Sequence, residues 1–246
     1  MSLKRTQKVW ETYGATDPLF GVLSDKSKRG GAWDEAEFFA TGRADIEEAL
    51  AYLDSIGVAL NKGSALDFGC GVGRLTQALG DQFREVTGVD ISAPMVENAR
   101  RYNRHGEHCR YFVNTEQNLA LFDAPSFDFI YTDKVLQHMN PRAAESYITE
   151  FFRILKPGGI ALFQVPSGRR VEPGSLGEAW YNFRKGPLRA AWKRVRGMQP
   201  VEMHHIHHSR VAEIIEAAGG VLVAKRQWGS VRRSRTSFQY CAAPGG

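Results

Sequence analysis

Residues 65–76 read Ala-Leu-Asp-Phe-Gly-Cys-Gly-Val-Gly-Arg-Leu-Thr, and this stretch decides the fold. A short apolar run leads into Asp67, a loop with a glycine at every second position follows, and a helical pattern begins after Gly73. Glycine adopts backbone conformations that a side chain forbids, and it leaves N–H groups exposed to a molecule lying against the loop. The strand, the glycine loop and the helix together predict a cradle for a nucleoside-containing cofactor.

The spacing of the glycines separates two kinds of cofactor. Dinucleotide-binding loops follow G-x-G-x-x-G, whereas this loop follows G-x-G-x-G and carries Arg74 where the third glycine would stand. Asp67 faces the loop from the strand end, where a carboxylate repels a pyrophosphate and attracts a cation. S-adenosylmethionine carries a sulfonium and an ammonium instead of phosphates, so it suits Asp67. Asp90 closes the next apolar run and can accept hydrogen bonds from both hydroxyls of a ribose.

These motifs resemble those of the class I S-adenosylmethionine-dependent methyltransferases, whose first motif is an acid followed by G-x-G-x-G. The resemblance continues through Phe-Asp-Phe-Ile-Tyr at 127–131 and Leu-Lys-Pro-Gly-Gly at 155–159, and it covers roughly residues 60–166. It implies S-adenosyl-L-methionine as cofactor, methyl transfer to a small-molecule acceptor, and a single methyltransferase domain over residues 1–246.

Apolar periodicity predicts a doubly wound α/β fold with a mostly parallel, seven-stranded Rossmann-like sheet and helices on both faces. We expect strands at 64–68, 85–89, 110–113, 127–132, 159–165, 221–226 and 236–242. We expect helices at 73–80, 94–104, 141–155 and from Ser209 to the glycines at 219–220. The resemblance implies that the last strand runs antiparallel to the others.

Additional segments surround this core. We divide the chain into an N-terminal helical lid, a cofactor-binding core, a basic helical insertion after the fifth strand, and a C-terminal helix with strands, at residues 1–60, 61–166, 167–203 and 204–246. The N-terminal helix starts at Asp34 and places Phe38-Phe39 and Thr41-Gly42 near the expected cleft. Docking of Phe38 and Phe39 on the sheet is the alternative.

The formal net charge of +5 is concentrated in the insertion, where residues 168–202 carry eight lysines and arginines against three glutamates. Apolar positions at 188–195 follow a helical spacing among these charges. Such a cationic amphipathic helix can cover a substrate pocket, bind an acidic acceptor or lie on an anionic membrane, and we favour the substrate lid. A local excess does not indicate a nucleic-acid partner. The Asn/Asp-Pro-Pro-Tyr/Phe and Pro-Cys signatures of base methylation are also missing.

The resemblance, followed residue by residue, gives the expected cofactor-binding set: Asp67, Gly69, Cys70, Gly71, Gly73, Asp90, Ile91, Met95, Asn114, Thr115 and Thr132. Asp90 would hold the ribose, and Ile91 and Met95 would enclose the adenine with apolar, polarizable contacts. Core packing is the alternative for Met95. Asn114 and Thr115 stand where the family usually carries an acid for the adenine amino group, so the pattern departs there.

Methyl transfer from a sulfonium is an in-line displacement that mainly needs alignment, so the acceptor's proton is the remaining chemical problem. A hydroxyl acceptor needs a general base, and histidine titrates near neutral pH. His138 follows the fourth strand near the cleft floor, and His204 begins the run His-His-Ile-His-His. We predict O-methylation with these two histidines as candidate bases, although either can have a structural role. Methylation of a small amine, aminopropyl transfer and a non-catalytic, cofactor-binding regulatory module are alternatives.

No metal site is predicted. Cys70, Cys109 and Cys241 are scattered, and the histidine run lacks a nearby cysteine or acid in metal-binding spacing. Residues 1–5 lack the apolar stretch of a secretory signal, and no apolar run approaches the roughly 20 residues that span a bilayer. We therefore expect a cytoplasmic protein. No pattern indicates an oligomeric state.

Overall fold

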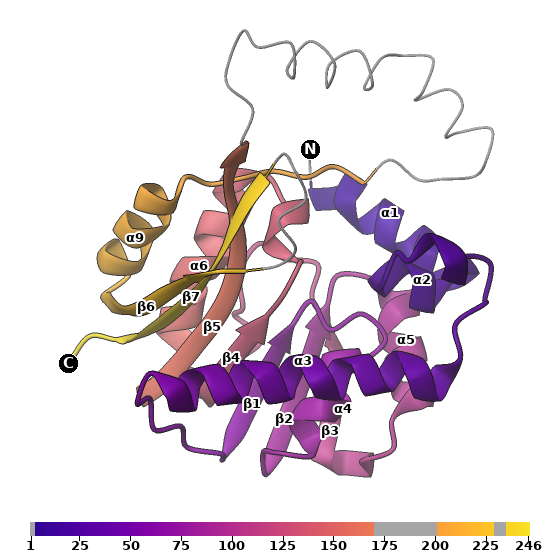
Figure 1. Cartoon of the computed structure of the whole chain (residues 1–246), viewed down its shortest axis with the longest axis horizontal. Helices are drawn as coiled ribbons and strands as arrows, with labels where there is room; N and C mark the ends of the chain where they lie inside the picture. The colour runs from indigo at the N-terminus through magenta and orange to yellow at the C-terminus, as the bar shows by residue number, and fades with distance from the viewer. Residues whose placement is uncertain (1–2, 170–200, 229–234) are drawn as a thin grey trace, which may run out of the picture.

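The computed structural model describes residues 3–169, 201–228 and 235–246. Its centre is a seven-stranded sheet with the order β3-β2-β1-β4-β5-β7-β6 (Figure 1). The strands are β1 (Ser64–Phe68), β2 (Glu85–Asp90), β3 (Cys109–Val113), β4 (Phe127–Thr132), β5 (Leu155–Arg169), β6 (Gly220–Gln227) and β7 (Arg235–Pro244). β7 pairs antiparallel with β5 and β6, and the other paired strands are parallel. The predicted α/β fold with one antiparallel strand is confirmed.

The helices alternate with the parallel strands, as the sequence predicts. The α-helices are α1 (Leu3–Thr16), α2 (Pro18–Val22), α3 (Glu35–Ser55), α4 (Arg74–Gly80), α5 (Ala93–Tyr102), α6 (Pro141–Ile154) and α9 (His208–Ala217). Single turns of 3-10 helix lie at η1 (Lys26–Lys28), η2 (Gly106–His108) and η3 (Leu136–His138). Asp34, Ser92 and Asn140 cap α3, α5 and α6 by accepting a hydrogen bond from a backbone N–H of the first turn. No described helix has the length and apolar character needed to cross a bilayer.

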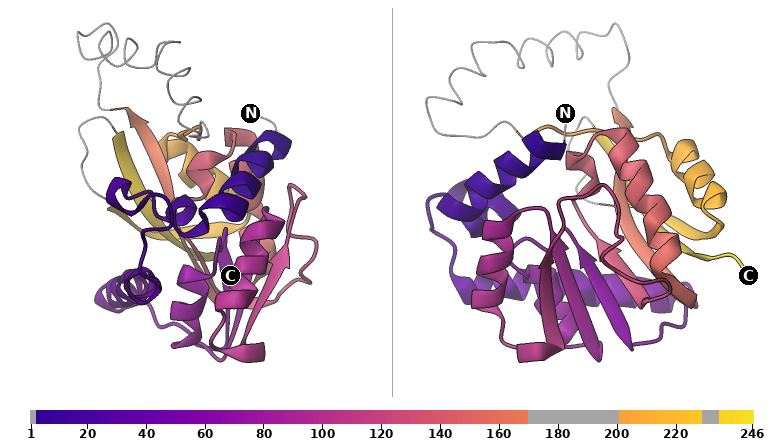
Figure 2. Two further views of the ribbon diagram at one scale, coloured as in Figure 1. Left: turned by 90° about the vertical axis from the view of Figure 1, so that its right-hand side faces the viewer. Right: turned by 180° about the vertical axis from the view of Figure 1, so that it is seen from behind.

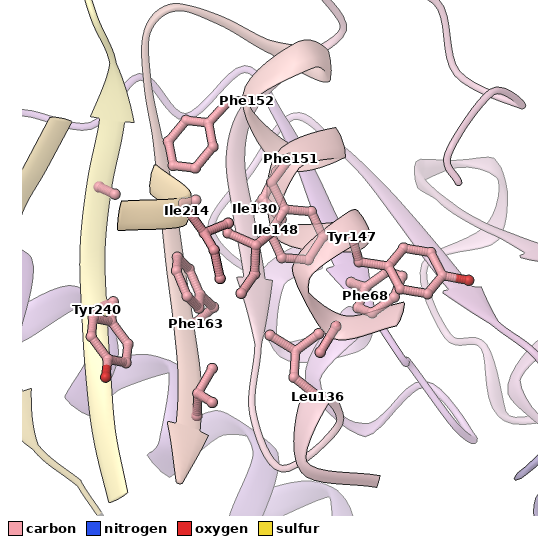
Figure 3. Packing of buried hydrophobic residues seen from close by; sticks show 14 of the residues in the cluster. Phe68, Ile130, Leu136, Tyr147, Ile148, Phe151, Phe152, Phe163, Ile214 and Tyr240 are labelled. Carbon is pink, nitrogen blue, oxygen red and sulfur yellow. The ribbon is translucent and has the colours of Figure 1, made fainter. Parts of the chain in front are cut away.

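The sheet is covered on both faces, so its central strands are apolar throughout. Every residue of β4 is buried, as expected for a parallel strand between two helical layers. One core joins the sheet to α6 and α9, and Figure 3 shows its rings, including Phe151 and Phe163, packed between β5 and α6. The other core joins the sheet to α3, α4 and α5. Figure 2 shows α6 and α9 in front when the molecule is turned by 180° from Figure 1.

At the amino-terminal ends of the strands, one carboxylate ties β1, β4 and β5 together. Asp128 accepts hydrogen bonds from the backbone N–H of Ser64 (2.8 Å), from Lys156 Nζ (2.9 Å) and from Asn61 Nδ2 (2.9 Å). Burial alone would raise the pKa of Asp128, but the bonds from Lys156 and Ser64 outweigh burial and hold this pKa below its usual value. This network contributes to stability, and it lies at the end of the sheet away from the glycine loop.

The lid candidates Phe38-Phe39 and Thr41-Gly42 do not line the main cavity. Phe38 and Phe39 are buried in a cluster with Met95, so α3 docks on the core and these two rings do not reach the main cavity. A Cβ atom at Gly42 would lie 2.3 Å from the Arg74 carbonyl oxygen, so this glycine lets α3 approach α4 closely. Within the lid predicted at residues 1–60, the part that covers the carboxyl ends of the strands is α1 and α2, two helices that were not individually predicted (Figure 1).

The boundary between α6 and β5 differs from the prediction, and most of the predicted insertion lies outside the described residues. The helix expected at 141–155 ends at Ile154, because Leu155 already pairs with Phe127, so β5 starts four residues earlier than expected and contains an irregularity. Of the predicted basic insertion at 167–203, residues 170–200 lie outside the described residues, and its proposed amphipathic helix lies there too.

Candidate active site

The glycine loop has the conformation that its sequence predicts. Gly69, Gly71 and Gly73 have φ angles of 79°, 53° and 83°, in the left-handed region that favours glycine. The backbone N–H groups of Gly69 and Cys70 donate to the Val89 carbonyl oxygen at 2.8 and 3.0 Å, which ties the loop to the end of β2. The loop is therefore a rigid floor built mostly from backbone.

The side chains of Val135 and Val22 pack closely against the glycine loop. A Cβ atom at Gly69 would lie 2.4 Å from Val135 Cγ2, and one at Gly71 would lie 2.6 Å from Val22 Cγ2. Val135 follows β4 and Val22 ends α2, so segments that are distant in sequence close over the loop. Glycine is needed at both positions for this close approach.

Asp90 ends β2 beside the loop and lines the main cavity. Its Oδ2 atom accepts from the Gly71 N–H at 2.9 Å, and its Oδ1 atom accepts from the Ser92 N–H at 2.8 Å. Burial raises the pKa of Asp90, and these two N–H donors oppose that effect. Each carboxylate oxygen keeps a further lone pair, so Asp90 can still accept from two neighbouring hydroxyls.

Asp67 lies beneath the loop and does not line the cavity. Thr76 Oγ1 donates to its Oδ2 atom at 2.7 Å, whereas Oδ1 has no hydrogen-bond partner among the described residues. Burial raises the pKa of Asp67 to about 7, although the Thr76 hydroxyl and the Arg74 charge oppose this. The carboxyl is therefore held under the loop, and the structure does not bring it to the cavity surface where the cofactor's cations were expected.

A cavity of about 760 Å³ opens above the loop, within the usual range of small-molecule sites. The cofactor-binding residues predicted from sequence that line it are Gly69, Gly71, Asp90, Ile91, Met95 and Asn114. Those that do not line it are Asp67, Cys70, Gly73, Thr115 and Thr132. Gly73 serves instead as the N-cap of α4, and Thr132 is a buried residue of β4. One end of the cavity thus contains the predicted ribose and adenine contacts.

Much of the rest of the wall is apolar and aromatic, and most of it was not predicted. Polar and charged side chains in the wall are Thr6, Ser24, Asp25, Asp133, Lys134, Gln137 and His138. Aromatic side chains in the wall are Trp10, Tyr13, Trp33, Phe68 and Tyr147. Aliphatic and methionine side chains in the wall include Val22, Leu23, Val135, Met139, Val201 and Met203. Figure 3 shows the Tyr147 ring beside Phe68, with its hydroxyl directed away from the core. A helical spacing at residues 6, 9, 10 and 13 was the available signal for α1.

His138 is the predicted catalytic residue that lines this cavity. Its ring packs edge-on against Trp10, with ring centroids 5.2 Å apart. Its Nδ1 atom lies 2.9 Å from the Glu202 carbonyl oxygen, and its Nε2 atom lies 3.2 Å from Gln137 Nε2. A carbonyl oxygen only accepts, so Nδ1 carries the hydrogen and Nε2 has a lone pair toward the Gln137 amide.

His204 and the rest of its run lie outside the cavity wall. The backbone N–H of His204 donates to the Gln137 carbonyl oxygen at 2.7 Å, and its ring Nε2 lies 3.5 Å from Glu202 Oε2. His207 is the N-cap of α9, and the backbone N–H of His208 donates to Ser167 Oγ at 2.8 Å. Among the described residues, no group of three or more histidine, cysteine, aspartate or glutamate side chains is placed to hold a metal ion.

The turn after β4 borders the same cavity. Asp133 accepts from Trp228 Nε1 at 2.9 Å and pairs with Lys134 Nζ at 2.8 Å. Lys134 has a φ angle of 61°, and its backbone is held by an N–H bond to Gln164 Oε1 and a carbonyl bond from Gln137 Nε2. This turn fixes the Gln137 amide next to His138.

The chain is similar to known methyltransferases in part of its sequence and in its fold. Residues 65–159 match the family described as methyltransferase domain. Magnesium protoporphyrin IX methyltransferase from Synechocystis PCC 6803, solved with bound SAH, has a similar fold with a TM-score of 0.63 at 18% identity, over 99% of each chain. A SAM-dependent methyltransferase from Leishmania major has a TM-score of 0.67 at 15% identity, over 98% of this chain and 82% of that one. Residues 65–159 thus match a methyltransferase family, and the fold is similar over nearly the whole chain to that of solved S-adenosylmethionine-dependent methyltransferases.

Curated relatives include the malonyl-[acyl-carrier protein] O-methyltransferase of Salmonella typhimurium, which is 30% identical over 132 residues, 54% of this chain and 45% of the relative. The ubiquinone biosynthesis O-methyltransferase of Bordetella avium is 23% identical over 207 residues, 78% of this chain and 85% of the relative. The chain spans about half the length of the first of these relatives.

The residues present fit the cofactor. Asp90 retains lone pairs for ribose hydroxyls, Gly69 and Gly71 leave room for close backbone approach, and Ile91 with Met95 offers apolar contacts in the same wall. S-adenosylmethionine bound there would supply an electrophilic methyl group to an acceptor in the same cavity.

Proposed function

We propose that the protein transfers a methyl group to a hydroxyl oxygen of a small apolar or aromatic acceptor, with His138 as the general base. The observation that carries this proposal is that His138 lines the same cavity as the glycine loop and Asp90. A base and a methyl-donor site that share one cavity can act on one acceptor.

The hydrogen bonds of His138 suit a base. Because Nδ1–H donates to the Glu202 carbonyl, Nε2 is the basic atom, and the Gln137 amide lies 3.2 Å from it. An acceptor hydroxyl that replaces this amide would donate to Nε2. As the oxygen–methyl bond forms and the sulfur–methyl bond breaks, the hydroxyl proton moves to Nε2, and the Glu202 carbonyl supports the resulting imidazolium.

The wall of the cavity supports an apolar acceptor. Trp10, Tyr13 and Trp33 extend apolar surface from the N-terminal segment toward the residues after β4. Such surfaces bind flat or aliphatic groups and exclude water, which keeps the hydroxyl and the methyl donor aligned. Trp10 also contacts the His138 ring and restrains its orientation.

The relatives' names support an oxygen acceptor, because both describe O-methyltransferases. A carboxylate, as in a malonyl group, or an amine that arrives uncharged would need no base. The earlier expectation of an acidic acceptor depends on the basic insertion, most of which lies outside the described residues. We therefore place the hydroxyl acceptor first and retain the carboxylate and the amine as outcomes of the test.

The test is a panel of phenols, aliphatic alcohols, carboxylic acids and amines, with release of S-adenosylhomocysteine as the readout. We expect turnover of hydroxyl compounds. For such an acceptor His138→Ala should lower kcat by about 10²–10⁴-fold, the usual contribution of a positioned base, and leave S-adenosylhomocysteine affinity unchanged. His204→Ala is the matched control, since this ring does not line the cavity.

Three results would contradict the proposal. If only carboxylic acids or only amines were methylated, the acceptor would be a carboxylate or an amine and not a hydroxyl. If the His138→Ala variant methylated a hydroxyl acceptor as fast as the parent, His138 would not be the general base. Cofactor binding without turnover of any compound would favour the non-catalytic regulatory module.

A further inference from the structure

A second cavity, of about 220 Å³, lies between α3, α4 and the turn that follows α5. Its polar lining residues are Arg43, Arg74, Gln77, Asp81, Arg104 and His105. None of these residues lines the large cavity. Figure 1 shows α3 crossing in front of α4. The methyl-transfer proposal assigns it no role.

Three arginines from three different segments surround this small space. Arg43 comes from α3, Arg74 from the first turn of α4, and Arg104 from the turn after α5. In the described part of the chain, the guanidinium groups of Arg43 and Arg104 have neither an ion-pair partner nor a hydrogen-bond acceptor. Like charges gathered at one cavity repel one another, and an anion between them would relieve that repulsion.

The inner side of the cavity is built from two buried side chains. Arg74 is 4% exposed, and its Nη1 atom donates to Asp45 Oδ2 at 2.7 Å and to Thr41 Oγ1 at 3.2 Å. Gln77 is 7% exposed, and its Oε1 atom accepts from the Arg104 backbone N–H at 3.3 Å. The Arg74 Nε and Gln77 Nε2 donors have no acceptor among the described residues. Both donors add positive potential beside the cavity.

Two carboxylates face the same region and limit its charge. Asp45 pairs with Arg74, and Asp81 lies 3.6 Å from His105 Nε2. The Asp45 carboxylate therefore offsets the charge of Arg74, whereas the contact of Asp81 with His105 is an ion pair only when the imidazole is protonated. With His105 neutral, three arginines against two carboxylates leave a net charge of +1 around the cavity, and Arg43 and Arg104 at its rim have no ion-pair partner in the described part of the chain.

We propose that this cavity binds a phosphoryl group, either as free orthophosphate or as part of a phosphomonoester. A planar guanidinium presents paired N–H donors that match the oxygens of such an anion, and two of them from different segments can hold it by charge-assisted hydrogen bonds. The volume suits a small anion and is below the range of drug-sized ligands. The inference is independent of the methyl acceptor.

The experiment is calorimetric titration of the full chain with orthophosphate and, separately, with glycerol 3-phosphate, in a phosphate-free buffer at constant ionic strength. We expect saturable binding of at least one of them, and the stronger ligand identifies the source of the phosphoryl group. Arg43→Gln and Arg104→Gln should each weaken binding about tenfold or more, the scale of one lost charge-assisted hydrogen bond. Both side chains are exposed, so these variants should fold.

Arg142→Gln is the matched control, because it removes an exposed arginine from α6 on the opposite face of the sheet. It should bind both phosphates as the parent does. The proposal is overturned if neither phosphate binds at millimolar concentration, if sodium chloride competes as strongly as phosphate, or if all three variants bind equally. S-adenosylhomocysteine titration of the same variants should give the parent's affinity, which shows that the chain remains folded.

Discussion

Substitution of Asp67 by asparagine should change how stability depends on pH. The carboxyl has a pKa of about 7 in the folded chain, against a usual value of 3.8, so the folded protein holds a proton that the unfolded chain releases. The stability associated with this proton is fully present below pH 3.8 and is lost as pH rises through 7. Because one pKa unit corresponds to about 1.4 kcal/mol, the parent should lose about 2.5 kcal/mol of unfolding free energy from this group between pH 5 and pH 8.

Asparagine cannot titrate, and its side-chain oxygen can still accept the hydrogen bond from the Thr76 hydroxyl. Urea denaturation of the cofactor-free protein at pH 5, 6, 7 and 8 measures the free energy of unfolding of both chains. The difference between parent and Asp67→Asn should change by about 2.5 kcal/mol across this range, in favour of the variant at pH 8. An unchanged difference would refute the reasoning, because it would mean that Asp67 is ionised throughout.

Asp128→Asn is the control for the sign of this effect. Hydrogen bonds from Lys156 and Ser64 hold the pKa of Asp128 below its usual value, so its contribution is present above that value and is lost only in acid. The variant should therefore be less stable than the parent at every pH from 5 to 8, by a nearly constant amount. A slope like that predicted for Asp67→Asn would show that the pH dependence belongs to neither carboxyl in particular.

Asp90→Ala should weaken S-adenosylhomocysteine binding by about 1–3 kcal/mol in calorimetry, since the ribose would lose charge-assisted hydrogen bonds; parent-like affinity would show that this residue does not hold the ribose. Gly71→Val should abolish cofactor binding in the same assay and keep a far-ultraviolet circular dichroism spectrum of the folded chain, because its Cβ would lie 2.6 Å from Val22 Cγ2 at a left-handed φ angle. Retained binding would mean that close backbone approach is unnecessary. His207→Ala should cost about 0.5–2 kcal/mol of unfolding free energy, the value of a helix N-cap, and leave turnover intact; a turnover loss without destabilisation would contradict a purely capping role.

The core of the fold was predictable because its signals are local. The buried strand that ends at Thr132 and the Asn140-Pro141 helix start specify their own conformations within a few residues. The end of α6 was missed by one residue because the pairing of Leu155 with Phe127 joins segments far apart in the chain. The register of strand pairing depends on tertiary contacts, so the secondary-structure propensity of a local sequence does not predict it.

The site divides in the same way. Gly69, Gly71 and Asp90 were predictable, because a loop that follows one strand and an acid that ends the next meet at the same edge of a parallel sheet. The wall formed by Trp10 and Tyr13 was missed, because sequence periodicity marks a helix but does not say which cavity its face will border. The histidine run shows the converse, since identical residue types serve as a cap, a backbone-bound turn and an exposed position.

The position of α1 and α2 has a consequence for engineering. They lie before β1 in the chain, yet they supply one wall of the large cavity, while Gly69 to Asp90 supply the cofactor side. The proposed acceptor wall and the glycine loop thus come from different stretches of sequence, although Val22 of α2 also lies against Gly71. A chimera that carries residues 1–34 from a related chain should inherit that relative's acceptor preference and keep the affinity of this chain for S-adenosylhomocysteine, so the N-terminal segment is the natural unit for exchanging specificity by recombination.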